Sequence, residues 1–199
     1  MKSAIPKAGG RGANRSAMAL VALGSNLGNS AKIVSDAIGR LQDFSDEPIL
    51  KSSLWQTTPV NCPPDSPKFV NAVAAFVPQK GETPESLLQK LQALEKEFGR
   101  APKKLLNEPR PLDLDLIAFG QQTRRTEDLV LPHPGAHLRR FVLQPLNQIA
   151  PDFILPGQLR TVSELLAGLS SNEIAVELGP PQEMREFQDS AGFRDNQAN

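Results

Sequence analysis

The chain has 199 residues, and its 22 Lys and Arg residues balance 22 Asp and Glu residues, so its formal net charge at pH 7 is zero. This balance argues against a protein that binds nucleic acid or a membrane over its whole surface. The single cysteine, Cys62, excludes an intramolecular disulfide and a zinc site built from several cysteines. No apolar run approaches the ~20 residues that a membrane helix needs.

The ends of the chain differ from its middle. Residues 1–17 are basic and contain no acidic residue, and the apolar core of a signal peptide does not follow the basic residues, so we expect a disordered tail rather than a secretory signal. A transit peptide is the alternative. Residues 172–199 are polar and mainly acidic, and we expect a solvated tail, with partial docking through Phe187 and Phe193 as the alternative. Between these tails we expect one domain, over residues 18–171.

The middle of the chain alternates strand and helix patterns. Two helices are indicated, one capped by Asn29 or Ser30 and one capped by Thr83 and ended by Gly99. The order β-α-β-β-α-β predicts an α+β, ferredoxin-like fold: an antiparallel sheet with helices on one face and a C-terminal extension. We expect further short strands and a helix over residues 127–150. Four apolar segments have strand patterns: residues 18–23, 50–57, 69–78 and 112–119.

The fourth predicted strand carries two carboxylates. Asp113 and Asp115 alternate with leucines, and the period of two in a strand puts both carboxylates on one face while the leucines face the core. Aspartate is depleted in strands, and two adjacent carboxylates repel each other unless a cation lies between them. Because Mg²⁺ binds one or two carboxylates together with phosphate oxygens, the pair predicts a metal and phosphate site. A solvated polar face is the alternative. Arg110, Lys103 and Lys104 precede the pair and suit anionic phosphates.

Four segments between Ala19 and Pro156 carry a family resemblance: VALGSNLGN, FVNAV, EPRPLDLDLIAFG and LVLPHPGAHLRRFVLQPLNQIAPDF. Through these segments the chain resembles the 6-hydroxymethyl-7,8-dihydropterin pyrophosphokinase family of folate biosynthesis. It implies a ferredoxin-like enzyme that transfers the β,γ-diphosphate of ATP to the pterin hydroxymethyl oxygen and releases AMP. It also implies a cytoplasmic monomer or weak dimer that binds ATP and hydroxymethyldihydropterin, and neither nucleic acid nor membrane.

The resemblance also implies roles for individual residues. The metal-binding residues, for two Mg²⁺ ions that accompany ATP, are Asp113 and Asp115, and the catalytic set adds Arg100 and Arg110. The ATP-binding positions are Gln92, Glu95, Arg110, His133 and Arg139. The pterin-binding positions are Thr57, Val60, Phe69, Asn71 and Phe141. The alternatives are core packing for the two phenylalanines, a backbone-bonded loop histidine for His133, and a solvated helix surface for Gln92, Glu95 and Arg139.

One loop departs from the family pattern. The segment GRAPKKLLNEPR keeps Arg100, but Pro102 and Leu106 stand at usually basic positions and Asn107 with Glu108 replaces a usual Trp–Gly pair. This loop closes over the substrates in the family, and lysine does not reproduce the paired donors of arginine. Losing such contacts lowers the rate more than the affinity when they form mainly in the transition state, so we expect reduced activity.

Three hypotheses follow from the sequence. The first is a working Mg²⁺-dependent pyrophosphokinase. The second is a degenerate homologue that binds pterin or nucleotide without efficient transfer and acts as a regulatory or assembly partner. The third, a generic ferredoxin-like binder of RNA or protein, is weakly supported, because the net charge is zero and the strand aromatics do not form an RNA-recognition pattern. Cys62 is expected to be an inert loop thiol.

Overall fold

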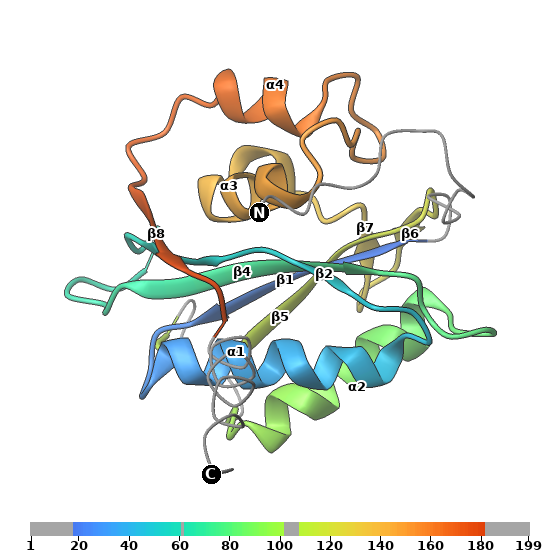
Figure 1. The fold of residues 1–199 in the computed structure, drawn as a ribbon, viewed down its shortest axis with the longest axis horizontal. Helices are drawn as coiled ribbons and strands as arrows, with labels where there is room; N and C mark the ends of the chain where they lie inside the picture. The colour runs from blue at the N-terminus through green and yellow to red at the C-terminus, as the bar shows by residue number, and fades with distance from the viewer. Residues whose placement is uncertain (1–17, 61, 102–107, 182–199) are drawn as a thin grey trace, which may run out of the picture.

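The computed structural model describes residues 18–60, 62–101 and 108–181, which form a sheet between two layers of helices (Figure 1). The strands are β1 (Ala19–Ser25), β2 (Leu50–Lys51), β3 (Leu54–Thr57), β4 (Phe69–Phe76), β5 (Asp113–Phe119), β6 (Arg124–Arg125), β7 (Val130–Leu131) and β8 (Ala175–Gly179). The helices are α1 (Ser30–Leu41), α2 (Pro84–Glu97), α3 (Arg140–Ile149) and α4 (Val162–Ala167), with short 3₁₀ turns η2 (Gln42–Phe44) and η3 (Ala136–Leu138).

The main sheet is antiparallel and runs in the order β5-β1-β4-β3-β8, with β2 beside β4; β6 and β7 form a separate hairpin. Its register places Asp113 opposite Gly24, Gly24 opposite Asn71, and Asn71 opposite Trp55. Residues directly opposite each other in an antiparallel sheet share a face. Positions on four strands therefore lie in one row on one face of the sheet, with side chains from β5, β4 and β3 and a glycine on β1.

Each face of the sheet has its own core (Figure 1). The helices α1 and α2 cover one face, where Leu23 and Leu114 pack against Ile38 and Leu91. The helices α3 and α4 cover the other face, where Leu20 and Val73 belong to the same cluster as the α3 side chains. The α+β fold with the predicted β-α-β-β-α-β order is confirmed, and the C-terminal extension supplies the second layer of helices.

The helices begin where the sequence places their caps. Asn29 accepts a hydrogen bond from the backbone N–H of Lys32 at 3.2 Å and so caps α1. Thr83 and Ser86 form a reciprocal capping box at the start of α2, with Pro84 in the first turn. Gly99 follows α2 with a φ of +85°, a conformation that glycine adopts without strain.

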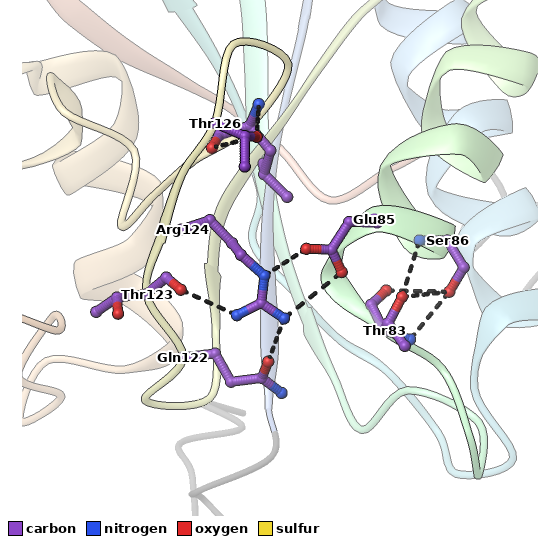
Figure 2. Close-up of polar contacts among 8 residues, drawn as sticks. Thr83, Glu85, Ser86, Gln122, Thr123, Arg124 and Thr126 are labelled. Carbon is purple, nitrogen blue, oxygen red and sulfur yellow. Dashed lines mark hydrogen bonds and ion pairs between the residues drawn. The ribbon is translucent and has the colours of Figure 1, made fainter.

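The β6–β7 hairpin is fastened to the start of α2 by one arginine (Figure 2). Arg124 pairs with Glu85 on the first turn of α2, and it donates further hydrogen bonds to Gln122 Oε1 at 2.8 Å and to the Thr123 carbonyl at 2.9 Å. The ion pair with Arg124 lowers the pKa of Glu85. This contact fixes the hairpin that leads into the segment containing His133.

Two details of the predicted fold are wrong. The predicted strand over residues 50–57 divides into β2 and β3, because Ser52 uses both its backbone N–H and its hydroxyl to bond Val73. The predicted polar tail from residue 172 contains β8, which pairs with β3 and places Thr57 opposite Ala175. The prediction therefore ended the domain too early.

The predictions for residues 1–17 and for Phe187 and Phe193 lie outside the described residues. Among the helices of the described segments, none is long and apolar enough to cross a membrane.

The packing of α2 gives a test of the core. Leu91 is fully buried, and replacing it by alanine leaves a cavity. We expect Leu91→Ala to lower the free energy of unfolding by about 2–5 kcal/mol in urea denaturation. The control is Gln89→Ala on the exposed face of the same helix, with an expected change within about 0.5 kcal/mol. Equal effects of the two substitutions would contradict the assigned burial.

Candidate functional site

A cavity of about 290 Å³ opens on the sheet face that carries α3, at the end where this helix begins. Its wall takes residues from β1, β3, β4 and β5, from the loops that follow β3, α2 and β7, and from the start of α3. It brings together eleven of the residues singled out from the sequence: Thr57, Val60, Phe69, Asn71, Arg100, Arg110, Asp113, Asp115, His133, Arg139 and Phe141.

The two aspartates of β5 lie on the cavity side of the strand. Leu114 and Leu116 alternate with them and are buried in the core on the opposite face. The sequence prediction that both carboxylates share a face is therefore confirmed. Their strand lies at the edge of the sheet, so that the row of polar side chains ends in a carboxylate.

Arginines hold both oxygens of Asp113. Arg100 Nη1 lies 2.7 Å from Oδ1, and Arg110 Nη2 lies 2.7 Å from Oδ2. The Arg110 Nε atom is buried and has no hydrogen-bond partner among the described residues. A buried guanidinium donor without a partner is costly unless a ligand accepts its hydrogen bond. The arrangement therefore favours an anion at this place.

Glu95 on α2 holds Arg100 from outside the cavity wall. It pairs with Arg100 and accepts the backbone N–H of Leu114 at 2.8 Å, which joins α2 to β5. Burial raises the pKa of Glu95 to about 6, and the nearby charges of Asp113 and Asp115 add to the effect, while the Leu114 N–H and Arg100 oppose it. Glu95 thus fixes Arg100 rather than lining the cavity.

Basic groups lie around Asp115, but they only partly offset the effect of burial on its pKa. Burial raises the pKa of Asp115, and Asp113 raises it further, while His133, Arg139 and Arg110 act in the opposite direction. Burial lowers the pKa of His133, against the pull of Asp115. His133 Nδ1 accepts the Gly135 N–H at 3.3 Å, which leaves the proton of the neutral ring on Nε2 as a donor for an anionic ligand.

The other half of the cavity suits a flat, polar ring. Asn71 donates from Nδ2 to the Thr57 hydroxyl at 2.7 Å, and this bond fixes the orientation of its amide. A Cβ atom placed on Gly24 would lie 2.9 Å from Asn71 Oδ1 and 3.9 Å from the Phe69 ring. Glycine at this register position therefore keeps the space beside Asn71 and Phe69 open.

Each phenylalanine of the wall has an arginine next to its ring. Arg110 Cζ lies 5.9 Å from the centroid of the Phe69 ring, and Arg139 Cζ lies 5.6 Å from that of Phe141. Both rings are only partly buried, so core packing alone does not account for them. The arginines that suit a phosphate and the rings that suit a flat ligand are therefore neighbours in the cavity wall.

Some predicted residues lie elsewhere. Gln92 is exposed on α2 and, like Glu95, is not among the described residues that line the cavity. The ATP contacts inferred for these two side chains stay predictions. The loop substitutions at Pro102, Leu106 and Asn107, together with the lysines at 103 and 104, fall outside the described residues.

Sequence reasoning missed three contributors to the site. Asn26, in the turn after β1, accepts the Arg110 N–H at 2.9 Å and donates from its backbone to the Arg110 carbonyl at 3.2 Å. Gly24 and Cys62 line the cavity. The GSN sequence after β1 signals a turn, but only the register of β1 with β4 and β5 shows what Gly24 and Asn26 contact.

The donor set suits a hard cation that also binds phosphate. No group of three or more His, Cys, Asp or Glu side chains in the described segments could hold a metal ion. Two carboxylates on one strand face still match Mg²⁺, which completes its coordination with water and phosphate oxygens. Soft or borderline metals with nitrogen and sulfur ligands fit this wall less well. Two acidic groups, three arginines and two aromatic rings define a nucleotide-dependent group-transfer site.

Comparison with known proteins narrows this class to one family. The family model described as 7,8-dihydro-6-hydroxymethylpterin-pyrophosphokinase matches residues 20–151. The chain is 40% identical over 148 residues to the 2-amino-4-hydroxy-6-hydroxymethyldihydropteridine pyrophosphokinase of Pseudomonas aeruginosa, covering 74% of this chain and 88% of that one. It is 34% identical over 163 residues to the Haemophilus influenzae protein of the same name, covering 81% and 98%.

Longer proteins contain a similar part. The chain is 39% identical over 136 residues to the folic acid synthesis protein fol1 of Pneumocystis carinii, covering 68% of this chain and only 18% of that protein. A crystal structure of Plasmodium falciparum HPPK-DHPS superposes with a TM-score of 0.62 at 13% identity, over 76% of this chain and 44% of that one. At this identity the structural match supports the fold alone.

The chain belongs to the 7,8-dihydro-6-hydroxymethylpterin-pyrophosphokinase family. Its reaction is the pyrophosphoryl transfer of folate biosynthesis.

The raised pKa of Glu95 predicts a pH-dependent contribution to stability. Between pH 4.5 and 6 the unfolded state releases this proton before the folded state does, so stability falls as pH rises through this window. We expect the free energy of unfolding of the wild type, relative to Glu95→Gln, to fall by about 2 kcal/mol from pH 4 to pH 7. Denaturant titrations of both proteins measure this difference, and a difference that rises with pH would contradict the assignment.

Proposed function

We propose that this cavity binds 6-hydroxymethyl-7,8-dihydropterin and ATP side by side and transfers pyrophosphate between them, with Asp113 and Asp115 as the Mg²⁺ ligands. One observation carries the proposal: two carboxylates share a strand face inside a wall of three arginines that also contains two aromatic rings. The family membership supports the reaction, and the residues that line the cavity support the roles proposed for them.

Asp113 and Asp115 would hold the magnesium ions that accompany ATP. When bound, Mg²⁺ neutralises part of the phosphate charge and aligns the β-phosphate with its acceptor. The two carboxylates are preorganised for this role, because β5 fixes both on one face and Arg100 and Arg110 orient Asp113. Binding of Mg·ATP would exchange these arginine contacts for phosphate contacts.

The basic residues bind the triphosphate. Arg110 offers a buried unpaired Nε, Arg139 lies beside the Phe141 ring, and neutral His133 offers an N–H. Arginine presents several N–H donors in one plane and binds phosphate oxygens in pairs. These donors stabilise the charge that spreads over the phosphate oxygens in the transition state.

Phe69 and Phe141 stack on the pterin ring, and Asn71 bonds its polar edge. A flat heteroaromatic ring gains stacking energy from aromatic side chains. Thr57 takes one Asn71 N–H, which orients the amide oxygen toward the space kept open by Gly24. Val60 lines the same part of the wall.

The chemical step is an in-line displacement. The pterin hydroxymethyl oxygen forms a bond to the β-phosphorus of ATP, the bond from that phosphorus to the oxygen shared with the α-phosphate breaks, and AMP leaves with this oxygen. The hydroxyl proton passes to solvent or to an oxygen of the site. Positioning and charge stabilisation carry most of such a reaction, so the chain needs no covalent nucleophile.

The carboxylates give the first test of function. We expect Asp113→Asn and Asp115→Asn each to lower the rate of AMP formation from ATP and 6-hydroxymethyl-7,8-dihydropterin by at least about a hundredfold, because each removes a magnesium ligand. The matched control is Asp152→Asn on the exposed surface, which keeps the wild-type rate.

The wild-type protein decides between turnover and binding alone. AMP formation that depends on both the dihydropterin and Mg²⁺ supports the enzyme. Wild-type protein that releases no AMP at any Mg²⁺ concentration, yet binds the pterin in calorimetry, contradicts the proposed transfer and leaves a binding protein.

Gly24 tests the pterin half of the cavity. A methyl group at this position would collide with the Asn71 amide oxygen, so we expect Gly24→Ala to raise the KM for the pterin about tenfold. The KM for ATP in the same variant is the internal control and should change less than twofold. A selective rise in the KM for ATP would contradict the placement of the pterin beside Asn71.

A further inference from the structure

We infer that Glu173 is a positioning residue. It acts through the first turn of α3 on the side chains that contact the pterin and the phosphates. The inference rests on the proposed function. Glu173 does not appear in the cavity wall among the described residues, and it lies beyond the part of the chain that the family model matches, residues 20–151.

The start of α3 lacks a local cap. Within the described chain, Arg139 makes no side-chain capping bond there, and the first turn of α3 contains no acidic residue. Helix starts leave backbone N–H groups without partners inside the helix. Two arginines, 139 and 140, also stand at this positive end of the helix, which is electrostatically unfavourable.

Glu173 supplies what the helix lacks. Its Oε2 accepts the Arg140 N–H at 2.9 Å, and its Oε1 accepts the Phe141 N–H at 2.9 Å. One carboxylate thus satisfies two backbone donors and places a negative charge at the helix start. The side chain is half-buried, and burial raises its pKa against these two hydrogen bonds.

The two residues fastened in this way carry or adjoin the ligand contacts. Phe141 is the aromatic residue on α3 that lines the cavity, and Arg139 directly precedes the helix and lines it as well. Stacking and phosphate binding both depend on the direction of the backbone at this turn. A cap that fixes the turn therefore fixes both groups before the ligands arrive.

The same segment also holds the opposite wall. Ile174 accepts the Thr58 N–H at 3.2 Å and donates its own N–H to the Thr58 hydroxyl at 3.2 Å. Ala175 then pairs with Thr57, whose hydroxyl orients Asn71. Three consecutive residues, 173–175, thereby link the α3 side of the cavity to its β3 side.

The experiment compares Glu173→Ala and Glu173→Gln with Glu177→Ala. Glu177 is a matched control, because it lies on β8 and accepts a hydrogen bond from Gln148 near the other end of α3. Calorimetry measures the affinity for 6-hydroxymethyl-7,8-dihydropterin in the presence of α,β-methylene-ATP and Mg²⁺. Amide hydrogen exchange at Arg140 and Phe141 reports the cap without any turnover.

We expect Glu173→Ala to weaken pterin affinity about tenfold and to speed exchange at both amides. Glu173→Gln, which keeps one acceptor oxygen, should give an intermediate loss, and Glu177→Ala should match the wild type in affinity. The graded order separates positioning from a general loss of stability, which thermal unfolding measures for each variant.

Wild-type affinity in Glu173→Ala, or equal losses in the alanine variants of both glutamates, would overturn the inference. Should Glu173→Ala fail to fold, the Gln variant carries the comparison, and unchanged affinity there is contradictory. A wild-type protein that binds pterin but releases no AMP contradicts the proposed function alone, and the affinity comparison still decides the role of Glu173.

Discussion

The site depends on two carboxylates on one edge strand whose negative charges are balanced by neighbouring basic side chains. A partly buried carboxylate is costly in a low-dielectric environment unless cations or hydrogen-bond donors surround it. Asp113 pairs with Arg100 and Arg110, and Asp115 lies close to Arg139 and Arg110, which oppose the rise of its pKa on burial. Substrate binding would replace the arginine contacts of Asp113 with contacts to bound ligands, and in the free state the strand and these arginines keep the carboxylates aligned.

The order of the strands places this pair of carboxylates beside a second, aromatic part of the same cavity. The strand β1 lies between β5 and β4, so only one strand separates the carboxylates from Asn71 and Phe69. The position on β1 between them is Gly24. The start of α3 then lies over the same end of the sheet and adds Arg139 and Phe141. Charged and aromatic groups therefore adjoin, as a reaction between a nucleotide and a flat ring requires.

Most of the fold and much of the wall could be predicted, because the signals are local. The alternation of Asp113 and Asp115 with leucines fixes which way each side chain points, and Thr83 with Gly99 fixes the ends of α2. The strand β8 was missed because it joins the sheet through backbone bonds, and two of its apolar side chains, Val176 and Leu178, are exposed. The roles of Asn26 and Glu173 depend on contacts with residues distant in sequence, which a pattern read along the chain does not contain.

The pairing of β8 with β3 has a consequence for the order in which the protein becomes competent during synthesis. Antiparallel neighbours close to each other in sequence, such as β3 and β4, can pair as soon as both have left the ribosome, but the other neighbour of β3 is the last described strand. Until then the edge of β3 is open, and the turn that presents Phe141 has no carboxylate from residue 173. A nascent chain therefore passes through a stage in which the carboxylates on β5 are already complete while the recognition half of the site is not.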